Sequence, residues 1–409
     1  MRFAVVNLGC KVNRVESDTI AQTLSAAGAG QASLEEADVV VVNTCTVTGE
    51  AEKKARKALR HALRANPHAP VIATGCAVAV APEAFAALDG RVAVEPDKAK
   101  VAALALALVP ELPRAPEAPA ESLLPLRMGA AFPTRVGIKV QDGCDNACTY
   151  CIVPAARGRA VSLPSAEVLA EARCYELAGV RELVLTGINL GSYRGLSQGP
   201  VDEGGGLAAL LAALLDATDH VRFRISSIEP CDVGESLVGL LATSGGRICR
   251  HLHLPLQSGS SRVLAEMGRP YDAAFYQALA GRLYGRIPGL ALSTDVIVGF
   301  PGESDADFKE TASLLASCRF SKVHVFPYSR REGTPAAARA DQVPAGEVAA
   351  RAAQLGRQAK ELRAQDRQRR RGTIEYALVE KEGQATTESY HRVAVDPSLR
   401  PGQLVRIVM

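Results

Sequence analysis

Three cysteines lie close together in the middle of the chain, in the segment Cys144-Asp-Asn-Ala-Cys148-Thr-Tyr-Cys151 directly after a predicted strand. Thiolates at this spacing can surround one compact metal centre. A structural zinc ion normally takes four protein ligands, and no fourth cysteine or histidine lies nearby. Three cysteines on a 4Fe–4S cluster would leave one iron open to a substrate or cofactor. A redox pair of Cys148 and Cys151, or a zinc loop completed from elsewhere, is the alternative.

Three further cysteines, Cys10, Cys45 and Cys76, are far apart in the chain, but each follows the end of a predicted strand within three residues. Because the carboxyl ends of parallel strands share one edge of a sheet, these thiols are expected to converge there. Gly9 and Gly75 beside them would let the backbone approach a bulky group closely. A single cysteine is more often a small buried hydrophobe, but three at equivalent positions favour a second cluster.

An α/β fold is expected to position these residues. Short apolar strands alternate with helical stretches at the start of the chain, which indicates a parallel sheet. The first strands and helices are expected at Arg2–Asn7, Val15–Ala27, Asp38–Asn43, Ala51–Ala65 and Ala69–Thr74. This domain is expected to end near Val109, before a segment rich in proline that reads as a semi-rigid linker.

Six more strands are predicted after Thr134, with helices such as Ser165–Ala178 and Asp305–Ser317 between them. The expected strands are Val136–Gln141, Glu182–Thr186, Val221–Ser226, His251–Leu256, Ala291–Val298 and Lys322–Tyr328. Six βα units favour a partial (β/α)6 barrel over a complete eight-stranded one, although an open doubly wound sheet fits the same pattern.

The C-terminal part of the chain begins with a basic helical stretch, Arg351–Arg371, which contains eight Arg or Lys and two acidic residues. Its net charge of +6, against +3 for the whole chain, leaves −3 for the remainder. Strands are expected afterwards at Thr373–Val379, Thr387–Val395 and Gln403–Met409, as a small antiparallel β-barrel. The predicted parts are 1–109, a linker at 110–133, a barrel domain at 134–345, a helical connector at 346–371 and a β module at 372–409.

The central cysteine spacing resembles that of the radical S-adenosylmethionine superfamily. The resemblance implies that the open iron chelates the methionine moiety of S-adenosylmethionine, and that an electron from the cluster then releases a 5′-deoxyadenosyl radical. Cys144, Cys148 and Cys151 would be the ligands, and Tyr150 would pack near the adenine. A buried core tyrosine is the alternative for Tyr150.

The chain as a whole resembles the methylthiotransferase family. The likeness is carried by Leu8-Gly9-Cys10-Lys11-Val12-Asn13, Asn43-Thr44-Cys45-Thr46 and Gly75-Cys76, followed by the central motif. It implies an auxiliary 4Fe–4S cluster on Cys10, Cys45 and Cys76, a central radical domain and a C-terminal TRAM domain that binds RNA. In the implied reaction a C–H bond becomes C–S–CH3. One S-adenosylmethionine supplies the methyl group and a second supplies the radical.

Polar residues at the predicted strand ends of the barrel resemble the family's cofactor-binding segments, and each could also be ordinary loop or capping chemistry. The residues expected to contact S-adenosylmethionine are Thr186, Gly187, Asn189, Ser227, Glu229 and Gln257. The segment from Asp295 to Glu303 and the sixth strand, around Tyr328, are further candidates. After Arg157-Gly158-Arg159 the sequence lacks the arginine and serine usual in the family, which argues against strong phosphate binding by that loop.

The substrate is predicted from charge and from the subgroup of the resemblance. The basic stretch beside a β module favours a polyanion, with a solvated helix face as the alternative. Cys10-Lys11-Val12-Asn13 with Cys45-Thr46-Val47-Thr48 resembles the bacterial branch that modifies carbon 2 of N6-threonylcarbamoyladenosine, next to the tRNA anticodon. A branch acting on isopentenyladenosine, a branch acting on a ribosomal protein, and a non-catalytic iron–sulfur RNA sensor remain alternatives.

The composition is ordinary for a soluble globular protein. Hydrophobic residues make up 47% and charged residues 22% of the chain, and no apolar run is long enough for a membrane span or signal peptide, so a cytoplasmic location is expected. The expected partners are the tRNA anticodon loop, a reductant protein such as flavodoxin or ferredoxin, and a sulfur donor. Cys174, Cys231, Cys249 and Cys318 show no ligand spacing and are predicted to be buried thiols.

Overall fold

The computed structural model describes residues 1–109, 134–195 and 205–409, so the predicted linker at 110–133 lies outside the described residues. The chain divides into two compact units. The first contains the described part of Met1–Arg127 together with Gly143–Asp145 and Cys151–Arg159. The second contains the described remainder, including the C-terminal sheet.

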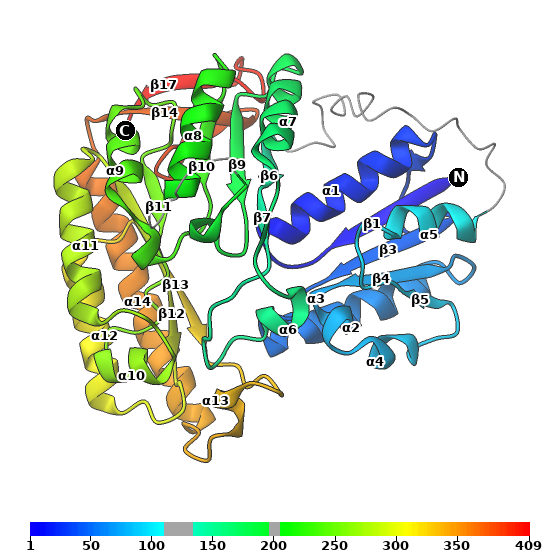
Figure 1. Cartoon of the computed structure of the whole chain (residues 1–409), viewed down its shortest axis with the longest axis horizontal. Coiled ribbons are helices and arrows are strands. Elements are labelled where there is room, and N and C mark those ends of the chain that lie inside the picture. The colour runs from blue at the N-terminus through cyan, green and yellow to red at the C-terminus, as the bar shows by residue number, and fades with distance from the viewer. Residues whose placement is uncertain (110–133, 196–204) are drawn as a thin grey trace. The chain divides into compact units, whose positions relative to one another are not determined.

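The first unit is built on a five-stranded parallel sheet in the order β2-β1-β3-β4-β5 (Figure 1). Its elements are β1 (Arg2–Asn7), α1 (Lys11–Ala26), β2 (Gly30–Gln31), β3 (Val39–Thr44), α2 (Gly49–Ala65), β4 (Val71–Gly75), α3 (Cys76–Val80), α4 (Pro82–Ala86), β5 (Val92–Val94), α5 (Val101–Leu108) and α6 (Val153–Arg157). The predicted parallel α/β domain is therefore confirmed, with strand bounds shifted by at most two residues.

Helices cover both faces of this sheet, which explains why β3 is a continuous run of valines. Val40 and Val42 pack in one apolar cluster with Leu59 of α2, while Val39 and Val41 pack in another with α1 and α5. All four valines are fully buried. A strand buried on both faces needs apolar side chains at every position, so the alternation typical of a half-exposed strand is absent.

The second unit contains six parallel strands, each followed by helical structure, in the order β6-β9-β10-β11-β12-β13. Two three-stranded sheets are joined where β10 meets β11, through the bridge between Ser227 and His253. The strands are β6 (Arg135–Lys139), β9 (Glu182–Thr186), β10 (Arg222–Ile225), β11 (His251–His253), β12 (Ala291–Val298) and β13 (Lys322–Pro327). The predicted partial barrel is confirmed, and the doubly wound alternative is excluded by this strand order.

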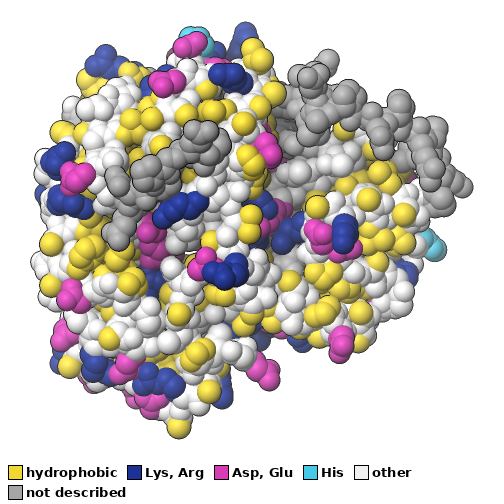
Figure 2. All heavy atoms as spheres, viewed as in Figure 1, with side chains coloured by type: hydrophobic (Ala, Val, Ile, Leu, Met, Phe, Trp, Pro, Cys, Tyr) yellow, Lys and Arg dark blue, Asp and Glu magenta, His cyan; other side chains and the backbone are white. Residues whose placement is uncertain are grey.

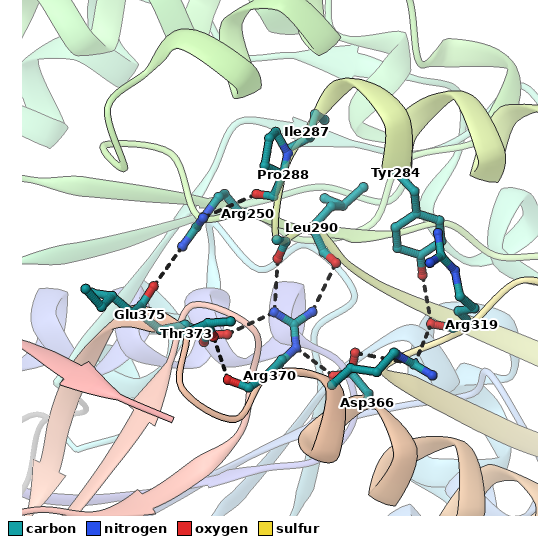
Figure 3. Close-up of a pocket in the computed structure, with 13 residues that line it drawn as sticks. Arg250, Tyr284, Ile287, Pro288, Leu290, Arg319, Asp366, Arg370, Thr373 and Glu375 are labelled. Atoms are coloured by element: carbon teal, nitrogen blue, oxygen red, sulfur yellow. Dashed lines mark hydrogen bonds and ion pairs between the residues drawn. The ribbon is translucent and has the colours of Figure 1, made fainter.

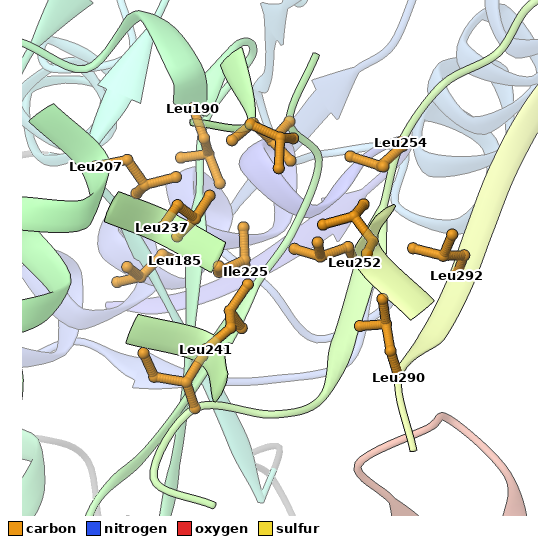
Figure 4. Packing of buried hydrophobic residues seen from close by; sticks show 14 of the residues in the cluster. Leu185, Leu190, Leu207, Ile225, Leu237, Leu241, Leu252, Leu254, Leu290 and Leu292 are labelled. Atoms are coloured by element: carbon orange, nitrogen blue, oxygen red, sulfur yellow. The ribbon is translucent and has the colours of Figure 1, made fainter. Parts of the chain in front are cut away.

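The helices of the second unit pack around the barrel strands, and the core between them is aliphatic. Its helices of one turn or more are α7 (Ser165–Leu177), η2 (Leu190–Ser192), α8 (Gly205–Ala217), η3 (Pro230–Asp232), α9 (Glu235–Thr243), α10 (Ser261–Glu266), α11 (Ala273–Arg286), α12 (Asp305–Ser317), α13 (Pro335–Ala338) and α14 (Ala345–Arg369). Figure 4 shows leucines from strands and helices, such as Leu185, Leu237 and Leu252, meeting in this core. A short antiparallel pair, β7 (Gln141–Asp142) with β8 (Val161–Ser162), flanks the cysteine loop.

The C-terminal module is a four-stranded antiparallel sheet in the order β16-β15-β14-β17. Its strands are β14 (Ile374–Lys381), β15 (Gln384–Thr387), β16 (Arg392–Ala394) and β17 (Leu404–Val408). The prediction of one strand over Thr387–Val395 was wrong, because the segment turns between β15 and β16, where Tyr390 has φ +63°. Residues of that turn contact the barrel, and these long-range contacts override local strand preference.

An ion-pair network attaches this module to the amino ends of the barrel strands. Glu182, at the start of β9, accepts hydrogen bonds from Arg222 Nε (3.0 Å) and Arg224 Nε (2.7 Å) of β10. Arg222 donates onward to the carbonyl of Tyr376, and Arg224 donates to the carbonyls of Thr387 and Glu388. The C-terminal sheet therefore lies at the end of the barrel opposite the carboxyl edge of its strands.

No helix within residues 1–109, 134–195 and 205–409 combines the length and the apolar character that crossing a membrane requires.

Candidate functional site

The structure brings Cys10, Cys45 and Cys76 together at the carboxyl edge of the first sheet. Asn13 Oδ1 lies 3.9 Å from Cys10 Sγ and 3.8 Å from Cys76 Sγ. A Cβ on Gly9, which has φ +106°, would lie 2.5 Å from Cys45 Cβ. The close approach of the first loop to Cys45 therefore requires glycine at position 9.

Asn13 holds this edge in place. Its amide nitrogen donates to the carbonyls of Leu8 and Thr44, both at 2.8 Å, and so links the loops after β1 and β3. The side chain is fully buried, and its oxygen faces the thiols. The sequence analysis used Asn13 only as part of a motif and did not assign it this role.

Arg157 is a second residue at these thiols that the sequence analysis did not identify. Its guanidinium Nε lies 3.1 Å from Cys76 Sγ, and its other nitrogens bind Asn13 Oδ1 at 2.6 Å and Glu16 Oε1 at 2.9 Å. The side chains of Arg157 and Glu16 are only 2% and 3% exposed. Burial raises the pKa of the Cys76 thiol, and the positive charge of Arg157 opposes this by favouring the thiolate.

The donor set of this edge fits an iron–sulfur cluster. Among the described residues, no group of three or more His, Cys, Asp and Glu side chains is placed to hold one metal ion. A cubane cluster makes a different demand, because each of its thiolates binds a separate iron and the sulfurs stand apart. Cys10 and Cys76 each follow a glycine of positive φ, Cys45 lies against Gly9, and an N–H group of Arg157 faces Cys76 Sγ, so this edge meets that demand.

The central cysteines are all partly exposed; Cys148 belongs to the second unit, and Cys144 and Cys151 belong to the first. In the second unit, Arg269 Nη1 lies 3.0 Å from Cys148 Sγ. The same guanidinium forms an ion pair with Glu229 and lies over the ring of Tyr271, 5.0 Å from its centroid. Burial raises the pKa of Glu229, and Arg269 opposes that effect. Arg269 was not anticipated, because nothing in its local sequence marks it.

The end of β9 is organised by Gln141, which the sequence analysis also missed. Gln141 Oε1 accepts from the backbone amides of Ile188 and Asn189, both at 2.9 Å. A Cβ on Gly187 would lie 2.9 Å from that oxygen, so a larger residue there would displace the Gln141 side chain. Thr186 Oγ1 donates to Ile138 O, and Asn189 Oδ1 caps the following 3₁₀ turn. The hydrogen bonds of Thr186 and Asn189 thus match the structural alternative stated for them.

Further polar residues gather at the ends of β10, β11 and β12. Ser227 pairs with His253 in the bridge between β10 and β11, and His253 Nε2 lies 3.2 Å from Asp295 Oδ2. Gln257 is half-buried and has φ +68°, which costs a residue other than glycine about 1–2 kcal/mol. Strain of this kind is often found at functional sites.

An apolar cluster next to the cysteine loop offers a surface for a planar ring. Val263, Met267, Phe300 and Ala336 are buried there, with Tyr150 and Tyr328 packed against them. The buried hydroxyl of Tyr328 has no hydrogen-bond partner among the described residues. An apolar surface with an unsatisfied hydroxyl, beside polar strand ends, fits the adenosyl group of S-adenosylmethionine.

The predicted basic stretch is only partly available to a ligand. Arg351 and Arg370 are buried, the first paired with Glu303 and Asp305 and the second with Asp366 and Glu375. Five of its eight basic residues are exposed, namely Arg357, Lys360, Arg367, Arg369 and Arg371. On the face in Figure 2, basic and acidic side chains are interspersed rather than gathered in one patch.

The prediction that all four remaining cysteines are buried was half wrong. Cys249 and Cys318 are buried, whereas Cys174 and Cys231 are exposed. Cys174 lies on the outer surface of α7, where apolar spacing along the helix does not determine which of several small residues faces the core.

Comparisons with known proteins find matches to two parts of the chain. Residues 2–94 match the family described as "Uncharacterized protein family UPF0004", and residues 138–315 match the "Radical SAM superfamily". A cobalamin-bound radical S-adenosylmethionine methyltransferase, TsrM of Kitasatospora setae, has the same fold, with a TM-score of 0.58, 16% identity and coverage of 82% of this chain and 77% of that one. The chain is thus a radical S-adenosylmethionine enzyme, a class that binds S-adenosylmethionine and a 4Fe–4S cluster.

Curated relatives show to which family of radical S-adenosylmethionine enzymes the chain belongs. A Bacillus subtilis protein named threonylcarbamoyladenosine tRNA methylthiotransferase MtaB is 39% identical, over 82% of this chain and 75% of its own length. The protein of that name from Aquifex aeolicus is 32% identical over the full length of both chains. A Desulfitobacterium hafniense protein named tRNA-2-methylthio-N(6)-dimethylallyladenosine synthase is 35% identical, over 82% and 76%. This chain belongs to the methylthiotransferase family.

Proposed function

We propose that this protein is a tRNA methylthiotransferase that replaces the hydrogen on carbon 2 of N6-threonylcarbamoyladenosine with a methylthio group. The observation that carries the proposal is full-length similarity to a relative with that name. Cys10, Cys45 and Cys76 near the strand ends of the first sheet, and three more cysteines within the segment that matches the radical S-adenosylmethionine superfamily, support it.

A second 4Fe–4S cluster on Cys10, Cys45 and Cys76 is part of this proposal. The position of Asn13 beside Cys10 and Cys76, the contact of Gly9 with Cys45 and the N–H donor of Arg157 at Cys76 support it. Hydrogen bonds to cluster sulfurs raise the reduction potential, and Glu16 keeps the local charge balanced. This cluster would be the site from which sulfur reaches the substrate.

The cofactor site of the barrel is assigned to the strand ends and the apolar cluster. Cys144, Cys148 and Cys151 would hold a 4Fe–4S cluster, which would supply the electron that cleaves bound S-adenosylmethionine to a radical. We assign Tyr150 and Tyr328 to the adenine, and Ser227, Glu229 and Gln257 to polar groups of the cofactor. Gly187 and Asn189 shape the loop after β9, and Thr186 supports it from within the strand.

Arg269 is proposed to position both a cofactor-binding residue and a cluster ligand. It joins Glu229, a proposed cofactor contact, to Cys148, a proposed cluster ligand, and it is buried against Tyr271. A buried guanidinium with these partners opposes the effect of burial on Glu229 and favours its charged form, which accepts hydrogen bonds.

The remaining assignments concern partners and the other domains. We place residues 1–109 as the methylthiotransferase domain, 110–133 as a linker, 134–345 as the radical domain, 346–371 as the connector and 372–409 as a TRAM domain that binds the tRNA. A reductant protein such as flavodoxin or ferredoxin would supply the electron, and a separate donor the sulfur. The enzyme would act in the cytoplasm on the anticodon loop, where an unstacked base can enter the barrel.

Mass spectrometry of tRNA nucleosides tests the proposal. Cells lacking the protein should contain N6-threonylcarbamoyladenosine without its methylthio derivative, and the chain should restore that derivative in a heterologous deletion strain. The relative named as a dimethylallyladenosine synthase makes isopentenyladenosine the second candidate substrate. Loss of methylthio-isopentenyladenosine instead would favour it, and no change in either nucleoside would contradict both.

A further inference from the structure

A basic pocket lies at the seam between the barrel and the C-terminal module, away from the cysteine loop. It has a volume of about 460 Å³, large enough for a phosphate group and part of its sugar. It is bordered by α11, the start of β12, the end of α14 and the start of β14 (Figure 3). Four arginines line it: Arg250, Arg319, Arg369 and Arg370.

Two of these arginines are occupied by the protein itself. Arg370 binds Asp366 and Glu375 and the carbonyls of Gly289 and Leu290, and therefore forms the pocket wall (Figure 3). Arg250 pairs with Glu388 at 2.8 Å. Neither guanidinium has spare charge to offer to a ligand.

Arg319 and Arg369 carry the charge that is left over. Within the described part of the chain no carboxylate pairs with Arg319, whose guanidinium lies 4.5 Å from the ring centroid of Tyr284. Tyr284 Oη donates to Arg319 O at 2.8 Å, and Arg369 Nη2 donates to the same carbonyl at 3.4 Å. Arg369 is 39% exposed and lies 3.7 Å from Asp366. The carbonyl of Arg319 thus holds both Tyr284 and Arg369. The guanidiniums of Arg319 and Arg369 leave the pocket with excess positive charge.

Arg319 also occupies a backbone position that disfavours it. It follows the end of α12 with φ +49°, in the left-handed region where glycine or asparagine is the usual residue. A long cation is held there in spite of the strain, stacked on a tyrosine and facing a hollow. Strained residues of this kind often serve binding.

The pocket and the cofactor site lie at opposite ends of one strand. Leu290 lines the pocket, and β12 runs from Ala291 to Val298, just before Phe300 of the cluster assigned to the adenine. Eight residues of extended chain span about 26 Å. A ligand that reaches both ends must therefore be a large folded molecule.

We infer that this pocket binds a backbone phosphate of the tRNA, through Arg319 and Arg369, at a point remote from the nucleotide being modified. The inference rests on the proposed function and adds to it the anchoring point of the RNA. Phosphate contacts position a nucleic acid without reading its sequence, so the pocket serves different tRNAs equally.

The test is a binding titration across a salt series with two RNAs: whole tRNA, and an oligonucleotide of the anticodon loop alone. The double variant Arg319→Asn, Arg369→Gln should bind tRNA roughly tenfold more weakly, as expected for one lost charge-assisted contact. Its log–log salt slope should flatten by roughly 0.7–0.9, the value for one phosphate. The affinity ratio between tRNA and oligonucleotide should fall, because the oligonucleotide cannot reach the pocket.

Arg286→Gln is the matched control, since Arg286 is exposed on the same helix as Tyr284 and pairs with Glu235 outside the pocket. It removes one charge, as each single variant at Arg319 or Arg369 does, and should leave the slope unchanged. Asparagine tolerates the left-handed region, so the single Arg319→Asn variant should melt no lower than wild type. If the double variant binds tRNA as tightly as wild type, or binds tRNA and the oligonucleotide equally more weakly, the inference about the pocket is wrong while the proposed function stands. A wild type that binds no tRNA would overturn the proposed function with it.

Discussion

Replacing Glu182 with glutamine should weaken the attachment of the C-terminal sheet to the barrel. Glu182 is fully buried between Arg222 and Arg224, whose guanidiniums also hold backbone carbonyls of β14 and of the turn after β15. Glutamine keeps the size of the side chain but removes its charge. The buried guanidiniums of Arg222 and Arg224 would then lose the carboxylate that both of them bind.

The size of the expected loss of stability follows from two separate arguments. Burial raises the pKa of Glu182, and the charges of Arg222 and Arg224 reverse this and lower it from 4.5 to about 2. A difference of that size corresponds to ~3 kcal/mol of stabilisation at pH 7. Breaking a buried ion pair by removing one partner typically costs about 3–5 kcal/mol. The expected loss is therefore about 3 kcal/mol.

Hydrogen–deuterium exchange read by mass spectrometry can measure this loss locally. Amides of β10 and β14 that exchange through opening of this interface should exchange roughly a hundredfold faster in the Glu182→Gln variant at pH 7, since ~1.4 kcal/mol is a factor of ten. Glu235 is a matched control, because it also pairs with two arginines, Arg282 and Arg286, but is 59% exposed. Glu235→Gln should change the free energy of opening, calculated from the exchange rates, by less than about 1 kcal/mol.

The stabilisation by Glu182 should depend on pH in a defined direction. The folded pKa of Glu182 is depressed, so its contribution is complete above about pH 4.5 and is lost as the pH falls toward 2. The difference between wild type and Glu182→Gln should therefore shrink by more than half between pH 7 and about pH 3. Equal stability of the two proteins at pH 7, or a difference that does not change with pH, would refute the reasoning.

Three further predictions concern the clusters. Anaerobically reconstituted protein should hold about eight iron atoms, and changing either cysteine triad to alanine should leave about four; a single cluster in wild type, or stoichiometric zinc, would contradict the two-cluster proposal. With Cys10, Cys45 and Cys76 changed to alanine, reduction should still give 5′-deoxyadenosine but no methylthio product, and a product in that variant would make the first triad structural. In protein whose central triad is already removed, Arg157→Gln should lower the reduction potential of the remaining cluster, because an N–H donor to Cys76 is lost. Redox titration monitored by electron paramagnetic resonance measures that potential. An unchanged potential would limit the role of Arg157 to packing.

Local sequence determined the elements and the identity of the chemistry. Apolar runs and capping residues gave the bounds of β9, β12 and α12 correctly to the residue, because strand and helix preferences act over neighbouring positions. The cysteine spacing and the motif around Cys10 led to the family, because cluster ligands and the glycines beside them have no chemical substitutes.

Only the tertiary structure decided which charged side chains are available. Arg351 and Arg370 look like their exposed neighbours in sequence, yet their partners Glu303 and Glu375 come from other elements and bury them. For the same reason, the turn that interrupts Thr387–Val395 and the placement of Arg157 at Cys76 could not be read locally. The residue types and spacing of this protein specify its chemistry, but whether an arginine faces solvent, a thiol or a buried carboxylate depends on how the folded chain brings elements together, as for Arg157 and Cys76, 81 positions apart.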